Sequence, residues 1–156
     1  MILNKLFKSS LSVTFLFLIV ACEEPNTGVN DVRVYEHDGI QIINPWLRKM
    51  PEGVSNTAGF MQIKNETGKP LVLEDVSLDW ARMGMIHESK VVDGMAKMIH
   101  QDALTISDTV DFAPGGLHIM VMGMDGPLDE KQTYNIHLHF SGREPLAVAF
   151  QVGEPR

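Results

Sequence analysis

The segment that decides the fold reads MGMIHESKVVDGMAKMIHQ, residues 83–101. It contains two short runs rich in methionine and β-branched residues, and the dipeptide Asp93-Gly94 lies between them. An Asp-Gly pair in this position is typical of a two-residue β-hairpin turn. A hairpin closed at this turn sets His87 opposite His100 and makes Met98 the diagonal neighbour of His87 on the same face. The segment therefore predicts an antiparallel pair of strands.

The chain after Asp31 repeats this pattern of short strand-like runs separated by turn residues, such as Asn-Glu-Thr-Gly at 65–68 and Pro-Gly-Gly at 114–116. No stretch of ten or more residues has a clear helical period with caps. Many short strands at close spacing are typical of an antiparallel β-sandwich or barrel, so we predict one all-β domain. The predicted strands are Val32–Tyr35, Ile40–Ile43, Gly59–Lys64, Leu71–Ser77, Met83–Glu88, Met95–Gln101, Thr109–Phe112, Leu117–Met122, Tyr134–Phe140 and Leu146–Val152.

Composition and charge restrict the classes of protein to which the chain can belong. Of its 156 residues, 44% are hydrophobic and 21% are charged, which are ordinary values for a globular protein with a hydrophobic core. They exclude a wholly disordered chain and a coiled coil. The formal net charge of −7 argues against a nucleic-acid partner, because phosphate binding requires clustered Lys and Arg.

The N-terminus is typical of a bacterial export signal. Lys5 and Lys8 give it a positive start, and an apolar run of ten residues follows at 11–20. This run is too short to span a bilayer as a mature helix but suits a signal peptide. The segment Ile19-Val20-Ala21-Cys22 resembles the lipobox of bacterial lipoproteins, in which the cysteine is acylated and becomes the new N-terminus.

We therefore predict a lipoprotein signal peptide at 1–21, a lipidated flexible tether at 22–30 and a β domain at 31–156. The tether is polar and contains Pro and Gly. Loss of Lys5 and Lys8 with the signal brings the formal net charge of the mature chain to −9. The expected location is the periplasm or cell envelope, with attachment to the membrane through a lipid on Cys22. As the only cysteine, Cys22 has no partner for a disulfide within the chain.

Methionine and histidine are concentrated in one window of the predicted domain. Seven of the ten methionines and three of the six histidines lie between Met83 and Met124. A single methionine is most simply a core residue. Thioether and imidazole together, however, suit Cu(I), whereas zinc prefers thiolate, imidazole or carboxylate.

Strand geometry limits which of these side chains can share an ion. His118 and Met120 lie two residues apart on one strand face, with their Cα atoms ~6.6 Å apart, and can converge on one metal. On the predicted hairpin, periodicity leaves His100 and Met98 as rival ligands. His137 and His139 also share a strand face and could bind Cu(II) or zinc weakly, although a solvent-facing side of an edge strand explains them more simply.

The stretch from Trp46 to the C-terminus resembles the bacterial PCu(A)C copper chaperones, known also as the DUF461 family. That family has a His, ten residues, a Met, about twenty-one residues and then His-x-Met. Here His87 is followed by ten residues, Met98, nineteen residues and then His118-Ile119-Met120. This sequence departs from the family pattern at two points. The spacer between Met98 and His118 is shorter, and Glu88 follows His87 where some members have Met.

Three further segments carry this resemblance. The stretch APGGLHIMVMG at 113–123 is similar to the most distinctive segment of the family. Pro45-Trp46, and GFMQIKN at 59–65 followed by Gly68, are similar to its N-terminal half.

The resemblance implies a cupredoxin-like β-barrel that holds one Cu(I) near the surface through His87, Met98, His118 and Met120. It implies a carrier and not an enzyme. It also implies delivery of copper to the CuA centre of cytochrome c oxidase, often beside a Sco-type thiol protein. The expected partners are thus the copper subunit of that oxidase and the Sco-type protein, and we expect the chain to be a monomer.

Two other functions fit the same sequence. One is a structural β-sandwich lipoprotein in which the methionines fill the core, and the other is a copper storage or tolerance protein. A blue-copper electron carrier fits poorly, because its site requires a Cys thiolate and Cys22 belongs to the lipobox.

Overall fold

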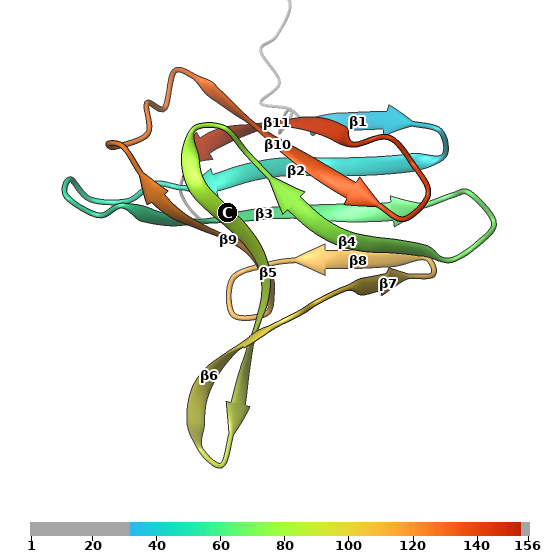
Figure 1. Ribbon diagram of the computed structural model, residues 1–156, viewed down its shortest axis with the longest axis horizontal. Coiled ribbons are helices and arrows are strands. Elements are labelled where there is room, and N and C mark those ends of the chain that lie inside the picture. Colours follow the sequence, from blue (N-terminus) through green and yellow to red (C-terminus); the bar gives the residue numbers. More distant parts are fainter. Residues whose placement is uncertain (1–31, 154–156) are drawn as a thin grey trace, which may run out of the picture.

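Figure 1 shows the computed structural model, which describes residues 32–153 and contains only strands and connecting loops in this range. The all-β class predicted from the sequence is therefore confirmed. The eleven strands are β1 (Val34–His37), β2 (Ile40–Arg48), β3 (Asn56–Asn65), β4 (Leu71–Ser77), β5 (Ala81–Val92), β6 (Met95–His100), β7 (Leu104–Ile106), β8 (Thr109–Phe112), β9 (Leu117–Met124), β10 (Thr133–Phe140) and β11 (Leu146–Gly153).

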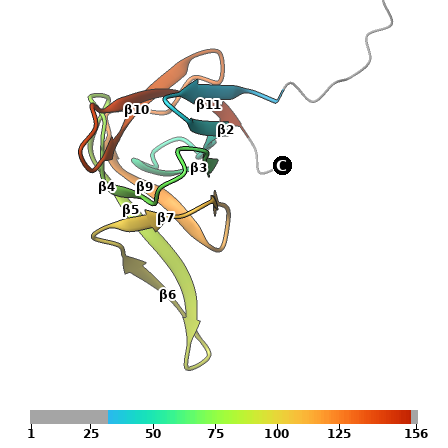
Figure 2. The same cartoon turned by 90° about the vertical axis from the view of Figure 1, so that its right-hand side faces the viewer.

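The strands form one continuous sheet in the order β6-β5-β9-β8-β3-β2-β11-β10-β4-β7, with β1 paired to β2 and an additional pairing between β9 and β3. Figure 2 shows the strands of the body wrapped around a common interior. The predicted sandwich or barrel is thus formed by a sheet that curls on itself. Two of its pairings, β11 with β2 and β8 with β9, are parallel, so the sheet is mixed and not wholly antiparallel.

The interior of this sheet is filled by aliphatic and aromatic side chains from almost every strand. Burial of such apolar surface is the main favourable term in folding. Of the methionines at 32–153, only Met61 and Met124 belong to the buried cluster. The largest of its fully buried side chains are Phe150, Ile40, Ile42, Leu47, Ile63, Leu73, Ile106, Ile119, Ile136 and Leu138.

Strand β2 is longer than the sequence predicted, because it continues through a bulge at Asn44-Pro45. The register with β3 shifts between Ile43 and Trp46, and Asn44 has a φ of 49°. A bulge accepts a proline because it leaves the ladder locally unpaired. The bulge carries β2 on to Arg48, next to the start of β3.

Strands β5 and β6 form an arm that projects from the body in both views (Figures 1 and 2). Asp93 and Gly94 have φ values of 54° and 76°, as a type I′ hairpin turn requires. His87 lies opposite His100, which confirms the predicted register. Every residue of β6 is exposed to solvent.

Most predicted strands coincide with observed ones, and several of the observed strands are longer. Strand β1 begins and ends two residues later than predicted, β6 ends one residue earlier, and one strand was missed. The missed strand is β7, a run of three residues that pairs with β4. Such a short run has no detectable period of its own. The residues that the structure describes contain no helix long and apolar enough to cross a membrane.

Candidate metal centre

The candidate site is built on the three neighbouring strands β6, β5 and β9. On β5, His87 lies between His100 of β6 and His118 of β9. The next row towards the body places Met85 of β5 opposite Met120 of β9. Three of the four residues implied by the resemblance are therefore neighbours on adjacent strands.

These side chains lie on the face of the sheet that points away from the core. Successive residues of a strand point to opposite faces. Ile86 and Ile119, which alternate with His87, His118 and Met120, are fully or almost fully buried in the core. The histidines and Met120 consequently belong to the outer face.

The imidazole rings of His87 and His118 are close enough to share an ion. Their centroids are 6.0 Å apart, and the rings are nearly perpendicular. The rings of His87 and His100 are 5.6 Å apart in a similar arrangement. The three imidazoles form a row across β6, β5 and β9, with His87 at its centre.

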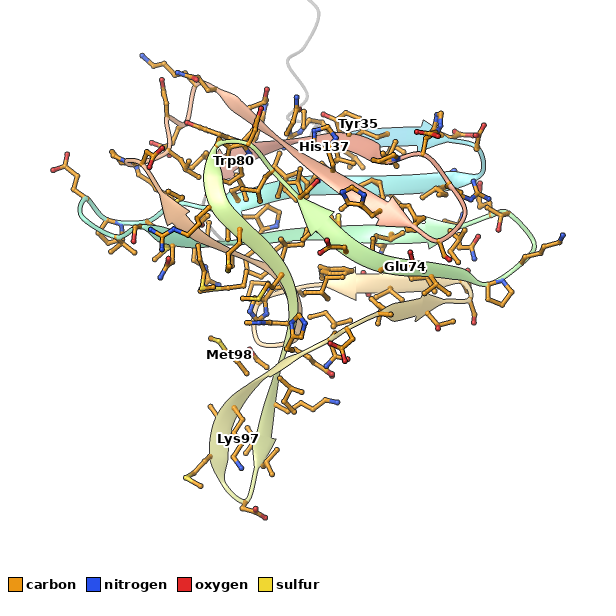
Figure 3. The ribbon with its side chains drawn as sticks, in the orientation of Figure 1. Tyr35, Glu74, Trp80, Lys97, Met98 and His137 are labelled. Atoms are coloured by element: carbon orange, nitrogen blue, oxygen red, sulfur yellow. The ribbon has the colours of Figure 1, made fainter. Side chains whose placement is uncertain are left out.

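A cleft of about 250 Å³ brings Met98 to the same place. It is bordered by Met98 and Ser89 on the arm, and by His118 and Met120 on β9. Met98 lies opposite Ser89, which makes it the diagonal neighbour of His87. In Figure 3, Met98 lies where the arm meets the body. His100 does not border this cleft, and its Nε2 lies 3.4 Å from a carboxylate oxygen of Asp102.

His118 is fixed in one orientation and one tautomer. The residue is only 5% exposed, and its Nδ1 lies 3.0 Å from the carbonyl oxygen of Gly116. A carbonyl can only accept, so Nδ1 carries the proton and Nε2 of the neutral ring has a free lone pair. Metal-binding histidines are commonly held in this way by their second nitrogen.

In His87, unlike His118, the Nδ1 nitrogen makes no hydrogen bond within the described part of the chain. This nitrogen is buried. Burial lowers the pKa of His87 below the ordinary value, and the neighbouring His118 and His100 lower it further. The ring therefore stays neutral at pH 7 and can offer a lone pair to a metal.

Phe60 and Arg48, which the sequence did not predict as site residues, form the far wall of the cleft. The Phe60 ring lies 6.5 Å from His118 and 4.5 Å from Trp46. The Arg48 guanidinium is 5.2 Å from the Phe60 ring, and Met50 also borders the cleft. No local spacing links Arg48 of β2 or Phe60 of β3 with the His-x-Met of β9, so only the fold places them at this wall.

The donors on this face are imidazole and thioether. Within residues 32–153, no three His, Cys, Asp or Glu side chains gather as a possible metal site. His118, Met98 and Met120 border the cleft. His87 does not border it, but its ring centroid lies 6.0 Å from that of His118 on the neighbouring strand. This donor set suits a soft ion such as Cu(I) better than zinc or magnesium.

The remaining histidines lie elsewhere. His137 and His139 are on β10, which lies between β11 and β4 and not at the edge of the sheet as expected. Nε2 of His139 lies 2.7 Å from the Ser77 hydroxyl. Figure 3 shows His137 well away from Met98. Cys22, the signal peptide and the tether lie outside the described residues.

Comparisons with known proteins identify the family of this chain. The family model described as "Putative lipoprotein LpqE-like" matches residues 40–152. A curated protein of Leifsonia xyli subsp. xyli, named "Putative lipoprotein Lxx21020", is 29% identical over 118 residues, which is 74% of this chain and 70% of that protein.

Solved structures share the fold. The copper-bound PCuAC domain from PmoF2 superimposes with a TM-score of 0.65 at 22% identity, covering 79% of this chain and 99% of that one. The solution structure of CuI-DR1885 from Deinococcus radiodurans has a TM-score of 0.57 at 28% identity, covering 71% and 76% of the two chains. The expected cupredoxin-like β fold is thereby confirmed.

Proposed function

This chain belongs to the LpqE-like family, and from that premise we propose that it is a copper chaperone of the cell envelope that binds Cu(I) and passes it on. The observation that carries the proposal is the meeting of Met98, His118 and Met120 at one open cleft, with the unpaired Nδ1 of His87 on the neighbouring strand. We assign the Cu(I) ligands as His87, Met98, His118 and Met120.

The chemistry of these donors suits a carrier. Thioether sulfur is neutral and soft, which favours Cu(I) over harder ions. Metal binding usually requires ligands to lose protons, but methionine has none to lose. Copper can therefore be released without protonation of a thiolate.

The geometry of the site suits a carrier as well. Met98 is 66% exposed, and it lies on the arm and not within the packed body. A ligand at the surface can be displaced first, which allows the ligands of an acceptor protein to enter. His118, in contrast, is buried and held by Gly116. We infer that copper leaves through exchange at Met98.

The relatives support copper as the cargo. One matched domain is described as copper-bound, and another structure is described with Cu(I). The alternative of a methionine-filled core receives no support from the burial pattern. Of the seven methionines between Met83 and Met124, only Met124 belongs to the buried cluster.

For the acceptor, we propose the CuA centre in the copper subunit of cytochrome c oxidase, with a Sco-type thiol protein as a second partner. The lipid on Cys22 would hold the carrier at the membrane surface where such an oxidase is assembled. A storage or tolerance protein would share the copper site but would not need to recognise this acceptor.

The test is copper transfer to a defined acceptor. The Cu(I)-loaded full chain is mixed with the apo CuA-binding domain, with and without the Sco-type protein, and the copper content of each protein is measured after separation. We expect copper to move to the acceptor faster than from a small-molecule Cu(I) complex of equal affinity. His118→Ala, which lacks one ligand of the proposed His–Met site, is the control. Retention of copper by the carrier under all conditions would favour storage.

A further inference from the structure

Two facing pairs of methionines continue the candidate site along the β5–β9 ladder. Met85 lies opposite Met120, and in the next row Met83 lies opposite Met122. Only Met120 has a place in the site proposed above. The other three have no role in that site, although all lie on the same pair of strands.

These methionines are not core residues. Gly84 lies between Met83 and Met85, and a Cβ at Gly84 would meet side-chain atoms of Val76 and Leu78 at 3.0 and 3.1 Å, so this position faces the interior. Because neighbouring residues point to opposite faces, Met83 and Met85 face outwards. Met83 is 43% exposed, and Met85 and Met122 are partly exposed. The buried core cluster contains none of the three.

The strand register brings the three sulfurs within reach of one ion. Directly opposed residues such as Met83 and Met122 have Cα atoms roughly 4.5–5.5 Å apart, and residues two apart on a strand are separated by ~6.6 Å. Methionine is unbranched and has three rotatable bonds, so its sulfur can adjust over such distances. On the other side of β9, Asn56 and Ala58 of β3 lie opposite Met122 and Met120, and neither brings a charge.

We propose that Met83, Met85 and Met122 form a second Cu(I) site that consists only of thioethers. Three neutral sulfur donors suit Cu(I), and they offer little to Zn²⁺ or Mg²⁺. The site is weaker than its neighbour because it lacks imidazole. Met85 faces Met120, so the second ion lies one row away from the first and can exchange with it as Cu(I), without a change of oxidation state or a proton transfer.

This inference rests on the proposed function only in taking Cu(I) as the cargo. The two sites use different side chains, so each can fail without the other. A face used only for docking an apolar partner protein would also be rich in methionine. It would bind no second copper.

The test is an anaerobic Cu(I) titration of the full chain in detergent against a chromophoric chelator of known affinity. The methionine methyl groups are followed by NMR in the same samples. We expect one tight equivalent and a second, weaker one that shifts the methyl signals of Met83, Met85 and Met122. The double variant Met83→Leu, Met85→Leu keeps similar side-chain volumes. It should lose the second equivalent and retain the first.

Met95→Leu is the matched control, since Met95 is 60% exposed at the tip of the arm and should leave both equivalents intact. Met122→Leu should reproduce the loss seen in the double variant. Binding of a single equivalent by both wild type and the double variant would overturn the second site and leave the first standing. If wild type binds one equivalent that the double variant loses, the His–Met site has failed and the thioether site stands.

Discussion

Replacement of Met98 by leucine separates the two candidate ligands of the arm. Met98 borders the cleft with His118 and Met120, whereas His100 lies 3.4 Å from Asp102 and does not border the cleft. If Met98 is the ligand, Met98→Leu should weaken Cu(I) binding strongly, and His100→Ala should change it little. The hairpin alone cannot predict this ranking, because both side chains lie on the same face.

The size of the effect follows from exposure and coordination. Met98 is 66% exposed, and surface substitutions usually change the free energy of unfolding by no more than about 0.5 kcal/mol, so the apo protein should remain folded. Loss of residues that merely support a metal ligand costs up to about 100-fold in affinity. Loss of a ligand itself should cost at least about 100-fold, which corresponds to about 2.8 kcal/mol of binding free energy.

The assay is competition for Cu(I) with a chromophoric chelator at pH 7, accompanied by thermal unfolding of each apo variant. His100→Ala should bind within about threefold of wild type, a difference of roughly 0.7 kcal/mol. A larger loss for His100→Ala than for Met98→Leu would refute the assignment, and the ligand would then be the imidazole directly opposite His87.

Four further predictions follow from the same site and from the sequence. The domain should bind Cu(I) far more tightly than Zn(II), because its donors are soft, and displacement of Cu(I) by excess Zn(II) in a competition titration would contradict the site. Cu(I) affinity should fall as the pH is lowered from about 8 to 5, because protons compete with Cu(I) for the imidazole nitrogens, and an unperturbed imidazole titrates near 6.5. The double variant His87→Met, His118→Met should show a much flatter profile, and an equally steep one would mean that neither histidine is a ligand. The pKa of His87 is lowered in the folded chain, so as the pH falls the imidazole of His87 is protonated in the unfolded chain before it is protonated in the folded one. The free energy of unfolding of the apo protein should therefore decrease below about pH 6.5. Urea titrations should show a smaller decrease for His87→Met. Cys22→Ser should release the protein from the membrane and leave copper binding unchanged, since the tether separates the anchor from the domain. If this variant stays in the membrane pellet after a salt wash, the protein has another anchor.

Local patterns in the sequence were sufficient to predict where most of the strands lie. Strands β4 and β8 begin and end at the predicted residues, because each is bounded by turn residues. The register of the arm was predictable as well, since a two-residue turn fixes every pair that follows it. Strand β7 and the second half of β2 were not, because their pairing depends on distant strands and on a bulge at Asn44-Pro45.

The kinds of ligand were evident from the sequence, but their meeting was not. Periodicity could place His118 beside Met120, and His87 opposite His100, because these relations lie within one strand or one hairpin. The pairing of β9 with β5, which sets His118 opposite His87, joins residues 31 positions apart. No local rule specifies such a pair, since its register is decided by which faces are buried in the core.

By itself, the sequence thus determined the all-β class, the hairpin arm and the supply of soft donors, because these depend on neighbours along the chain. Only the tertiary structure decided that β9 pairs with β5 and that Phe60 and Arg48 wall the cleft. It also decided that most methionines of the window face outwards. The reason is physical: the curled sheet buries its aliphatic face, so the alternate positions of the same strands, which include the proposed ligands, are left on the outer face.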